Sequence, residues 1–194
     1  MDGCVHFGLK RTRWAAVLAL SAVLGGFPAA ASDGEDELKS AIVWAFLQYS
    51  DWSVRPAADT PITVGVLGRS AFRQFLGHYL EGKTVNNRPV RVVEVKAVTD
   101  LHGCAAVYFA TDKGTEIKQL LPAARAAHAL TVGETDRFVE WGGAVNLFLV
   151  DGHMSFEVSL GTLEQSGIAI SSKLLRWGQI RDLAKIKTMA RPAQ

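Results

Sequence analysis

The chain has little cysteine and lacks the common catalytic motifs, and these absences exclude several classes of protein. Two cysteines occur in 194 residues, Cys4 and Cys104, so a disulfide-rich scaffold is excluded. The nucleophile elbow G-x-S-x-G, the zinc motif H-E-x-x-H and the redox motif C-x-x-C are all absent. The sequence therefore indicates a protein that is not an enzyme and needs no cofactor.

A metal site is also not predicted. His102, Cys104 and the nearby Asp100 could contribute ligands, but no second cluster of ligand residues accompanies them. A structural zinc ion requires four protein ligands. Glu157 with Glu140 or Asp151 could form an acid–base pair, but acidic residues are too common for this to carry weight.

Residues 1–31 have the pattern of a secretory signal peptide. Three basic residues precede an apolar run from Trp14 to about Phe27, and Ala29-Ala30-Ala31 provides a small-residue cleavage site. The run is shorter than the roughly 20 residues of a membrane-spanning helix, although an uncleaved anchor is the alternative. We predict a protein exported to the periplasm, without membrane insertion after cleavage.

Removal of the signal peptide changes both the charge and the cysteine count. Residues 32–194 retain 18 basic and 18 acidic residues, so neutrality gives no reason to expect nucleic-acid binding. Cys4 leaves with the signal, so Cys104 has no partner for an intramolecular disulfide. We predict that Cys104 is a buried apolar residue at the start of a strand. An exposed or intermolecularly bonded thiol is the alternative.

The region from Gly142 to Arg176 contains the strongest local signal, a β-hairpin. Asp151-Gly152 separates two apolar runs and suits a type I′ turn. The turn fixes a register in which Asn146 faces Glu157 and Phe148 faces Ser155. One side, predicted to face the core, consists of Val145, Leu147, Leu149, Met154, Phe156 and Val158. The other side, with Asn146, Phe148 and Glu157, is either a half-solvated sheet face or a binding surface.

Strands alternate with helices before this hairpin, which predicts the fold class. We expect a single α/β domain over residues 32–178, with a mixed, mostly parallel sheet, helices on both faces and a C-terminal β-hairpin. Apolar residues beyond Gly178 recur every three positions, which does not hold one stripe of a helix. Residues 179–194 are therefore predicted to be a C-terminal tail.

The first predicted helix, beginning at Asp36, is apolar on most of its circumference. Its expected core face consists of Leu38, Ile42, Ala45, Phe46 and Tyr49. Trp44 and Leu47 lie on the other side, with Val43. That side is either buried within the domain or available for a partner or a homodimer.

Two turns could hold an anion. Gly68 ends a predicted strand, Ser70 would cap the next helix, and Arg69 could contact a phosphate. The turn lacks the glycine and lysine pattern of a phosphate-binding loop. Ser171 would cap a second helix that begins at Ser172 and Lys173, and simple capping is the alternative to anion binding there.

The chain resembles the YfiR family over about residues 37–176. The resemblance rests on Gly142-Gly143, Asn146, Asp151-Gly152 and Phe156-Glu157, and above all on the segment Ile170-Ser171-Ser172-Lys173-Leu174-Leu175. Paired cysteines found in some members are absent here.

The resemblance implies a periplasmic repressor that binds the sensor domain of an inner-membrane diguanylate cyclase and lowers cyclic di-GMP and biofilm formation. We expect Asn146, Phe148, Glu157 and Leu163 to contribute to this regulation, with the Trp44 side of the first helix as a second candidate surface. The alternative function is a small-molecule binding protein, or an unrecognised exported enzyme, that uses one of the two anion-binding turns.

Overall fold

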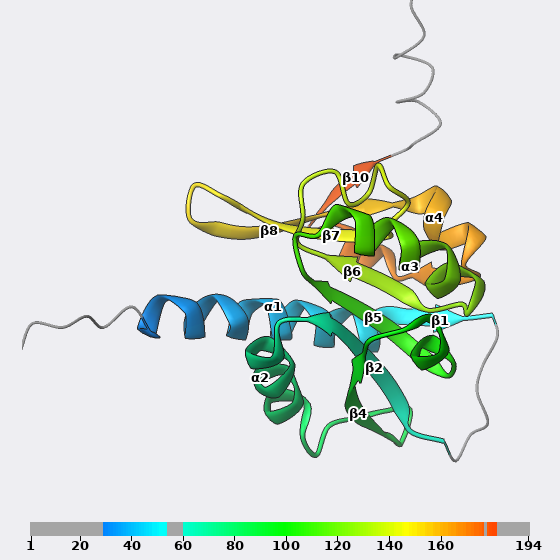
Figure 1. The fold of residues 1–194 in the computed structure, drawn as a ribbon, viewed down its shortest axis with the longest axis horizontal. Coiled ribbons are helices and arrows are strands. Elements are labelled where there is room, and N and C mark those ends of the chain that lie inside the picture. The colour runs from blue at the N-terminus through cyan, green and yellow to red at the C-terminus, as the bar shows by residue number, and fades with distance from the viewer. Residues whose placement is uncertain (1–28, 54–59, 177, 182–194) are drawn as a thin grey trace, which may run out of the picture.

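The structure is a computed structural model that describes residues 29–53, 60–176 and 178–181 (Figure 1). The predicted signal peptide lies outside these ranges, except for Ala29–Ala31, which belong to the first turn of α1. The helical elements are α1 Ala29–Tyr49, α2 Ser70–Leu80, the 3-10 helix η1 Val98–Leu101, α3 Gly114–Ala126, α4 Leu160–Gln165 and α5 Ser172–Leu175. The strands are β1 Ser50–Trp52, β2 Ile62–Gly68, β3 Thr84–Val85, β4 Arg88–Val95, β5 Cys104–Ala110, β6 Leu130–Gly133, β7 Val145–Val150, β8 His153–Ser159, β9 Ile168–Ile170 and β10 Gln179–Arg181.

An eight-stranded sheet in the order β10-β8-β7-β6-β5-β2-β4-β3 forms the centre of the domain. Its pairings are parallel except for β7–β8 and β3–β4. β1 and β9 form a separate antiparallel pair. The predicted mixed, mostly parallel α/β fold is confirmed.

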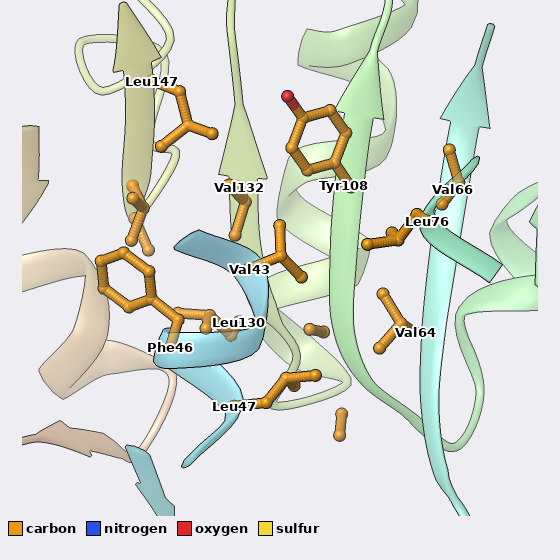
Figure 2. Packing of buried hydrophobic residues seen from close by; sticks show 14 of the residues in the cluster. Val43, Phe46, Leu47, Val64, Val66, Leu76, Tyr108, Leu130, Val132 and Leu147 are labelled. Carbon is orange, nitrogen blue, oxygen red and sulfur yellow. The ribbon is translucent and has the colours of Figure 1, made fainter. Parts of the chain in front are cut away.

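Helices cover both faces of this sheet, as predicted. The central strands β2 and β5 are buried at almost every position, which requires cover on both sides. α1 and α2 pack on one face, where Phe46 and Leu47 lie beside Leu130 (Figure 2). α3 packs on the other face through Ile117 and Leu121.

The buried face of α1 differs from the predicted one. Leu38 and Tyr49, expected in the core, are 50% and 47% exposed. The helix is rotated so that the buried side carries Asp36, Lys39, Ser40, Val43, Phe46 and Leu47. Leu47 is therefore a core residue and presents no surface to a partner. The helix tolerates this orientation because its inward polar groups find partners at the ends of the strands.

The hairpin register is confirmed at every predicted pair from Val145–Val158 to Val150–His153. Asp151 and Gly152 both have positive φ, 50° and 78°, as a type I′ turn requires. The predicted core face is wrong at its distal end, because Leu149 is 53% exposed where the hairpin extends beyond the sheet (Figure 1).

Two further expectations are corrected at element ends. Arg69, not Ser70, occupies the N-cap of α2, and its side chain makes no capping bond. α3 continues through Pro122, although proline in a helix interior removes one backbone hydrogen bond. The predicted tail from residue 179 begins as β10, which pairs in parallel with β8; residues 182–194 lie outside the described ranges.

Gly68 ends β2 at a point where the chain admits no side chain. Its φ is +100°, and a Cβ atom there would lie 2.3 Å from the carbonyl oxygen of Ala110. The close approach lets the next amide, Arg69 N–H, donate to that same oxygen at 3.0 Å. Glycine at this position thus fixes the direction in which Arg69 leaves the sheet.

We predict that Gly68→Ala lowers the free energy of unfolding by about 1–3 kcal/mol, because it combines a positive φ with a backbone clash. Gly161→Ala is the matched control, since nothing lies within 4 Å of its added Cβ and alanine favours a helix by about 0.5–1 kcal/mol. Urea unfolding measures both. Equal stability of the two variants would contradict the close packing at Gly68.

Candidate functional site

An open basin lies at the carboxyl ends of β2, β5 and β6. The chain leaves β2 through α2 toward β4 on one side and leaves β5 through α3 toward β6 on the other. This is a topological switch point, the place where open α/β sheets bind ligands. The basin has a volume of about 1060 Å³. Its walls are Gly68–Arg69, Ala110–Lys113 and Glu134–Asp136 at the strand ends, Glu35 and Lys39 on α1, and Leu147–Leu149 with Met154 on the hairpin.

A cluster of charged residues ties α1 to the floor of the basin. Lys39 pairs with Glu35 and Glu134, and its side chain is 7% exposed. Arg69 Nη2 lies 3.3 Å from Asp36 Oδ1 and 3.2 Å from Glu134 Oε1. Glu134 therefore receives two cations from different elements, which is how a buried carboxylate is compensated.

Tyr108 completes this cluster from below. Its ring is fully buried in β5, packs 4.4 Å from the Phe72 ring, and carries its hydroxyl toward the carboxyl ends of the strands (Figure 2). That hydroxyl donates to Glu134 Oε2 at 3.0 Å. A polar atom at the top of an apolar core thus has a partner.

Two groups of this cluster, Tyr108 and Lys39, have raised pKa values. Burial and the adjacent Glu134 carboxylate raise the pKa of Tyr108 well above its ordinary value. For Lys39, burial opposes the charged form, but hydrogen bonds to Glu134 and Glu35 prevail and raise the pKa. An acid–base catalyst works best with a pKa near the operating pH, and these two groups titrate far above neutrality. Their geometry suits binding and positioning.

The residues that sequence analysis assigned to regulation are only partly brought together. Phe148 is half-buried and lines the basin. Asn146 Nδ2 donates to Glu157 Oε1 at 3.4 Å, so the expected pair exists. Asn146 is only 5% exposed, however, and its Oδ1 is buried without a hydrogen-bond partner. Leu163 is 2% exposed and belongs to the core, so it presents no surface to a partner.

The other predicted surfaces lie elsewhere. Trp44 is half-buried against the core, with Lys83 Nζ 5.7 Å from its ring centre. Ser171 caps α5 by accepting from the Lys173 amide at 3.4 Å. The Ser171 amide donates to Tyr49 O, at the opposite end of α1 from the Arg69 contact, roughly 20 Å away at 1.5 Å per residue. Ser172 and Lys173 are exposed. The two predicted anion-binding turns, at Arg69 and at Ser171, therefore lie far apart and cannot form one site.

Sequence reasoning missed Asp36, Lys39, Tyr108 and Glu134 as site residues. The available signal was the spacing of Asp36, Lys39, Ser40 and Val43, which forms one continuous helical stripe. Hydrophobic periodicity does not select that stripe as the buried face, because the other faces of the helix are more apolar.

Cys104 is buried, as predicted. Its Sγ lies 3.3 Å from Asp100 O, and burial raises the pKa of the thiol, which makes it unreactive. Across the described ranges, no three potential metal ligands gather. No helix in that part of the chain has the length and hydropathy to span a membrane.

The profile of the YfiR/HmsC-like family matches residues 36–179. The chain belongs to this family. The match begins at Asp36, the partner of Arg69, and ends at the first residue of β10, so it includes the whole hairpin and all of the basin lining except Glu35. Membership of this family supports, in general terms, the role of a periplasmic regulator.

Comparison with solved structures shows the fold. A conserved domain protein from Vibrio cholerae O1 biovar El Tor matches with a TM-score of 0.52 at 12% identity, over 75% of this chain and 59% of that one. The ABC domain from Streptococcus pneumoniae, solved in complex with L-Trp, matches with a TM-score of 0.44 at 12% identity, over 62% of this chain and 55% of that one. The YfiR/HmsC-like chain thus spans less than two thirds of either. A search of curated proteins gave no match.

The raised pKa values predict a loss of stability in alkali. Tyr108 and Lys39 both bind their protons more tightly in the folded state. Their contribution is complete below the unfolded values of about 10 and 10.4 and disappears as the pH rises through the folded values. Unfolding free energy should therefore fall above pH 10, by up to about 1.4 kcal/mol per pH unit for each group.

Tyr108→Phe should reduce this alkaline slope, and it should cost about 1 kcal/mol at pH 8 through the lost hydrogen bond. Tyr49→Phe, at an exposed position on α1, is the matched control. Urea titrations at intervals from pH 8 to 11 compare the three proteins. A slope in Tyr108→Phe equal to that of the parent would contradict the assignment.

Proposed function

We propose that this YfiR/HmsC-like protein binds the periplasmic sensor domain of an inner-membrane diguanylate cyclase and restrains its activity, so that cyclic di-GMP and biofilm formation fall. The observation that carries the proposal is the family match over residues 36–179, which spans both walls of the basin. Export to the periplasm through the signal peptide of residues 1–31 is part of the proposal.

The hairpin side of the basin has the properties of a protein-binding surface. Leu149 and Val150 are 53% and 44% exposed, and Phe148 and Met154 are half-buried beside them. Adjacent exposed apolar side chains bordered by polar groups are typical of interaction sites. Arg69 and Glu134 supply such a polar border across the basin.

Restraint of a cyclase requires a difference in affinity between its states. A regulator that bound the active and inactive sensor domain equally would shift no population. A preference of about 100-fold, or roughly 2.7 kcal/mol, is enough to change a balanced equilibrium to one dominated by the inactive form. A few apolar side chains that become buried only against the inactive state would provide this difference.

Binding of a small anion in the basin is the second candidate function. Arg69 supports it, because its side chain is 46% exposed at a topological switch point. Its two carboxylate partners hold it in position, and an anionic ligand would contact the exposed edge of the guanidinium. Ser171, Ser172 and Lys173 lie too far away to join this site.

We expect Phe148→Ala and Glu157→Gln to weaken restraint of the cyclase without unfolding the protein. Loss of the Phe148 ring should reduce binding of the sensor domain by about tenfold, the equivalent of 1.4 kcal/mol. Val98→Ala removes an exposed apolar side chain on η1 and is the control. Cellular cyclic di-GMP, measured in the host with each variant replacing the parent, should rise in the first two only. If the first two simply fail to accumulate, these residues are structural.

The anion hypothesis predicts stabilisation by phosphate compounds. A ligand at a hundred times its Kd adds about 2.7 kcal/mol, which raises the Tm of a chain this size by roughly 5–10 °C. Arg69→Gln should abolish the shift, whereas Arg91→Gln, beside Thr63 at the start of β2, should keep it. Thermal unfolding with inorganic phosphate and with nucleotides tests this. No shift with any of them would exclude the anion function.

A further inference from the structure

β7 loses its neighbour halfway along its length. It pairs with β6 only at Val145 and Asn146, whereas its pairing with β8 continues to Val150. The outer edge of residues 147–150, which we call the free edge of β7, therefore has no strand beside it in the described part of the chain. Figure 1 shows the hairpin projecting past the rest of the sheet.

The backbone of this free edge is ready to pair. Asp151-Gly152 forms a two-residue loop, so Val150 and His153 make the first hydrogen-bonded pair of the hairpin. Alternation along an antiparallel ladder then directs the N–H and C=O groups of Leu147 and Leu149 away from β8. The parallel pairing of Gly133 with Asn146 uses the Leu147 N–H. The Leu147 C=O and both backbone groups of Leu149 are therefore left without a strand partner in the described part of the chain.

The sequence of the free edge lacks the usual protection against pairing. Natural edge strands are shielded by charge, by proline or by short length. Leu147-Phe148-Leu149-Val150 contains neither charge nor proline. The opposite edge of the sheet has both, because β4 contains Pro89 and the charged residues Arg88, Arg91 and Glu94. An unprotected apolar edge indicates a site that accepts another strand.

The surroundings distinguish the β7 edge from the β8 edge. β8 is also without an outer neighbour at residues 153–156, since β10 pairs only with Glu157–Ser159. The basin, however, lies on the β7 side, between the free edge and Glu134 at the end of β6. Leu147, Leu149 and Met154 share one face of the hairpin and line this basin. Leu147 is buried in the core, so Leu149 and Met154 would contact the side chains of an added strand.

We propose that the free edge of β7 binds an extended segment of the partner protein by strand addition, with alternate apolar residues of that segment entering the basin. Backbone hydrogen bonds to Leu147 and Leu149 give the affinity, and the basin selects the side chains. The inference deepens the proposed function and rests on it for the identity of the partner, the periplasmic domain of a diguanylate cyclase.

The test uses overlapping 12-residue peptides that cover the periplasmic domains of the host's diguanylate cyclases. Binding to the mature protein is measured by fluorescence anisotropy, and amide hydrogen exchange locates the contact. We expect at least one peptide to bind and to slow exchange at the Leu149 amide, the outward N–H of β7 that has no partner strand. N-methylation of alternate peptide amides should abolish its binding, a result that needs no variant of the protein.

Leu149→Pro removes an outward N–H from the β7 edge and should weaken peptide binding about tenfold or more, as expected for loss of a hydrogen bond. Leu149→Ala is the matched comparison, because it shortens the same side chain but keeps the outward N–H, and it should weaken peptide binding less than Leu149→Pro. Equal weakening by both variants, unchanged affinity in Leu149→Pro, or a lack of amide protection on β7 would overturn the inference.

Failure of the strand-addition inference can be told apart from failure of the proposed function. If the parent and Leu149→Pro lower cyclic di-GMP equally in the host, regulation stands and strand addition is wrong. If the parent does not lower cyclic di-GMP, the proposed function is wrong, and the peptide and exchange measurements decide strand addition independently.

Discussion

The ion pair between Lys39 and Glu134 fixes α1 over the carboxyl ends of the central strands. Lys39 is 7% exposed and Glu134 is 18% exposed, and an unpaired charge at such depth costs several kcal/mol. A displacement of α1 by one turn would separate Lys39 from Glu134 and leave it only Glu35 of the same helix. Apolar contacts such as Phe46 against Phe156 are less demanding of position. The polar contact therefore sets the register of the helix, and with it one wall of the basin.

Features determined by local sequence could be predicted. The hairpin register follows from Asp151-Gly152, because a two-residue turn leaves one way to pair the strands, and all six pairs are as expected. The central strands were recognisable as continuous apolar runs, and the parallel topology followed from their alternation with helices. The candidate site was predicted in part, since Arg69 and Phe148 both line the basin.

Features that depend on contacts between residues distant in sequence could not be predicted from the sequence. α1 is apolar on nearly every side, so periodicity does not choose its buried face, and Leu38 was placed in the core although it is half exposed. The actual choice depends on Glu134, which is remote in sequence and lies beside Lys39 because it directly follows β6 in the folded sheet. Exposure of Leu149 likewise depends on where β6 ends, which the pattern of β7 does not contain.

The Lys39–Glu134 pair and the exposure of Leu149 give the two walls of the basin different properties. The cations of the charged wall, Lys39 and Arg69, are already paired with carboxylates of the same chain, so a ligand gains little net charge attraction from them. The hairpin wall has exposed apolar side chains at Leu149 and Val150 and backbone groups without an outer strand. Under the proposed function, most of the binding free energy therefore comes from the hairpin, while the charged wall, whose carboxylates are already paired within the chain, gives the basin a fixed shape.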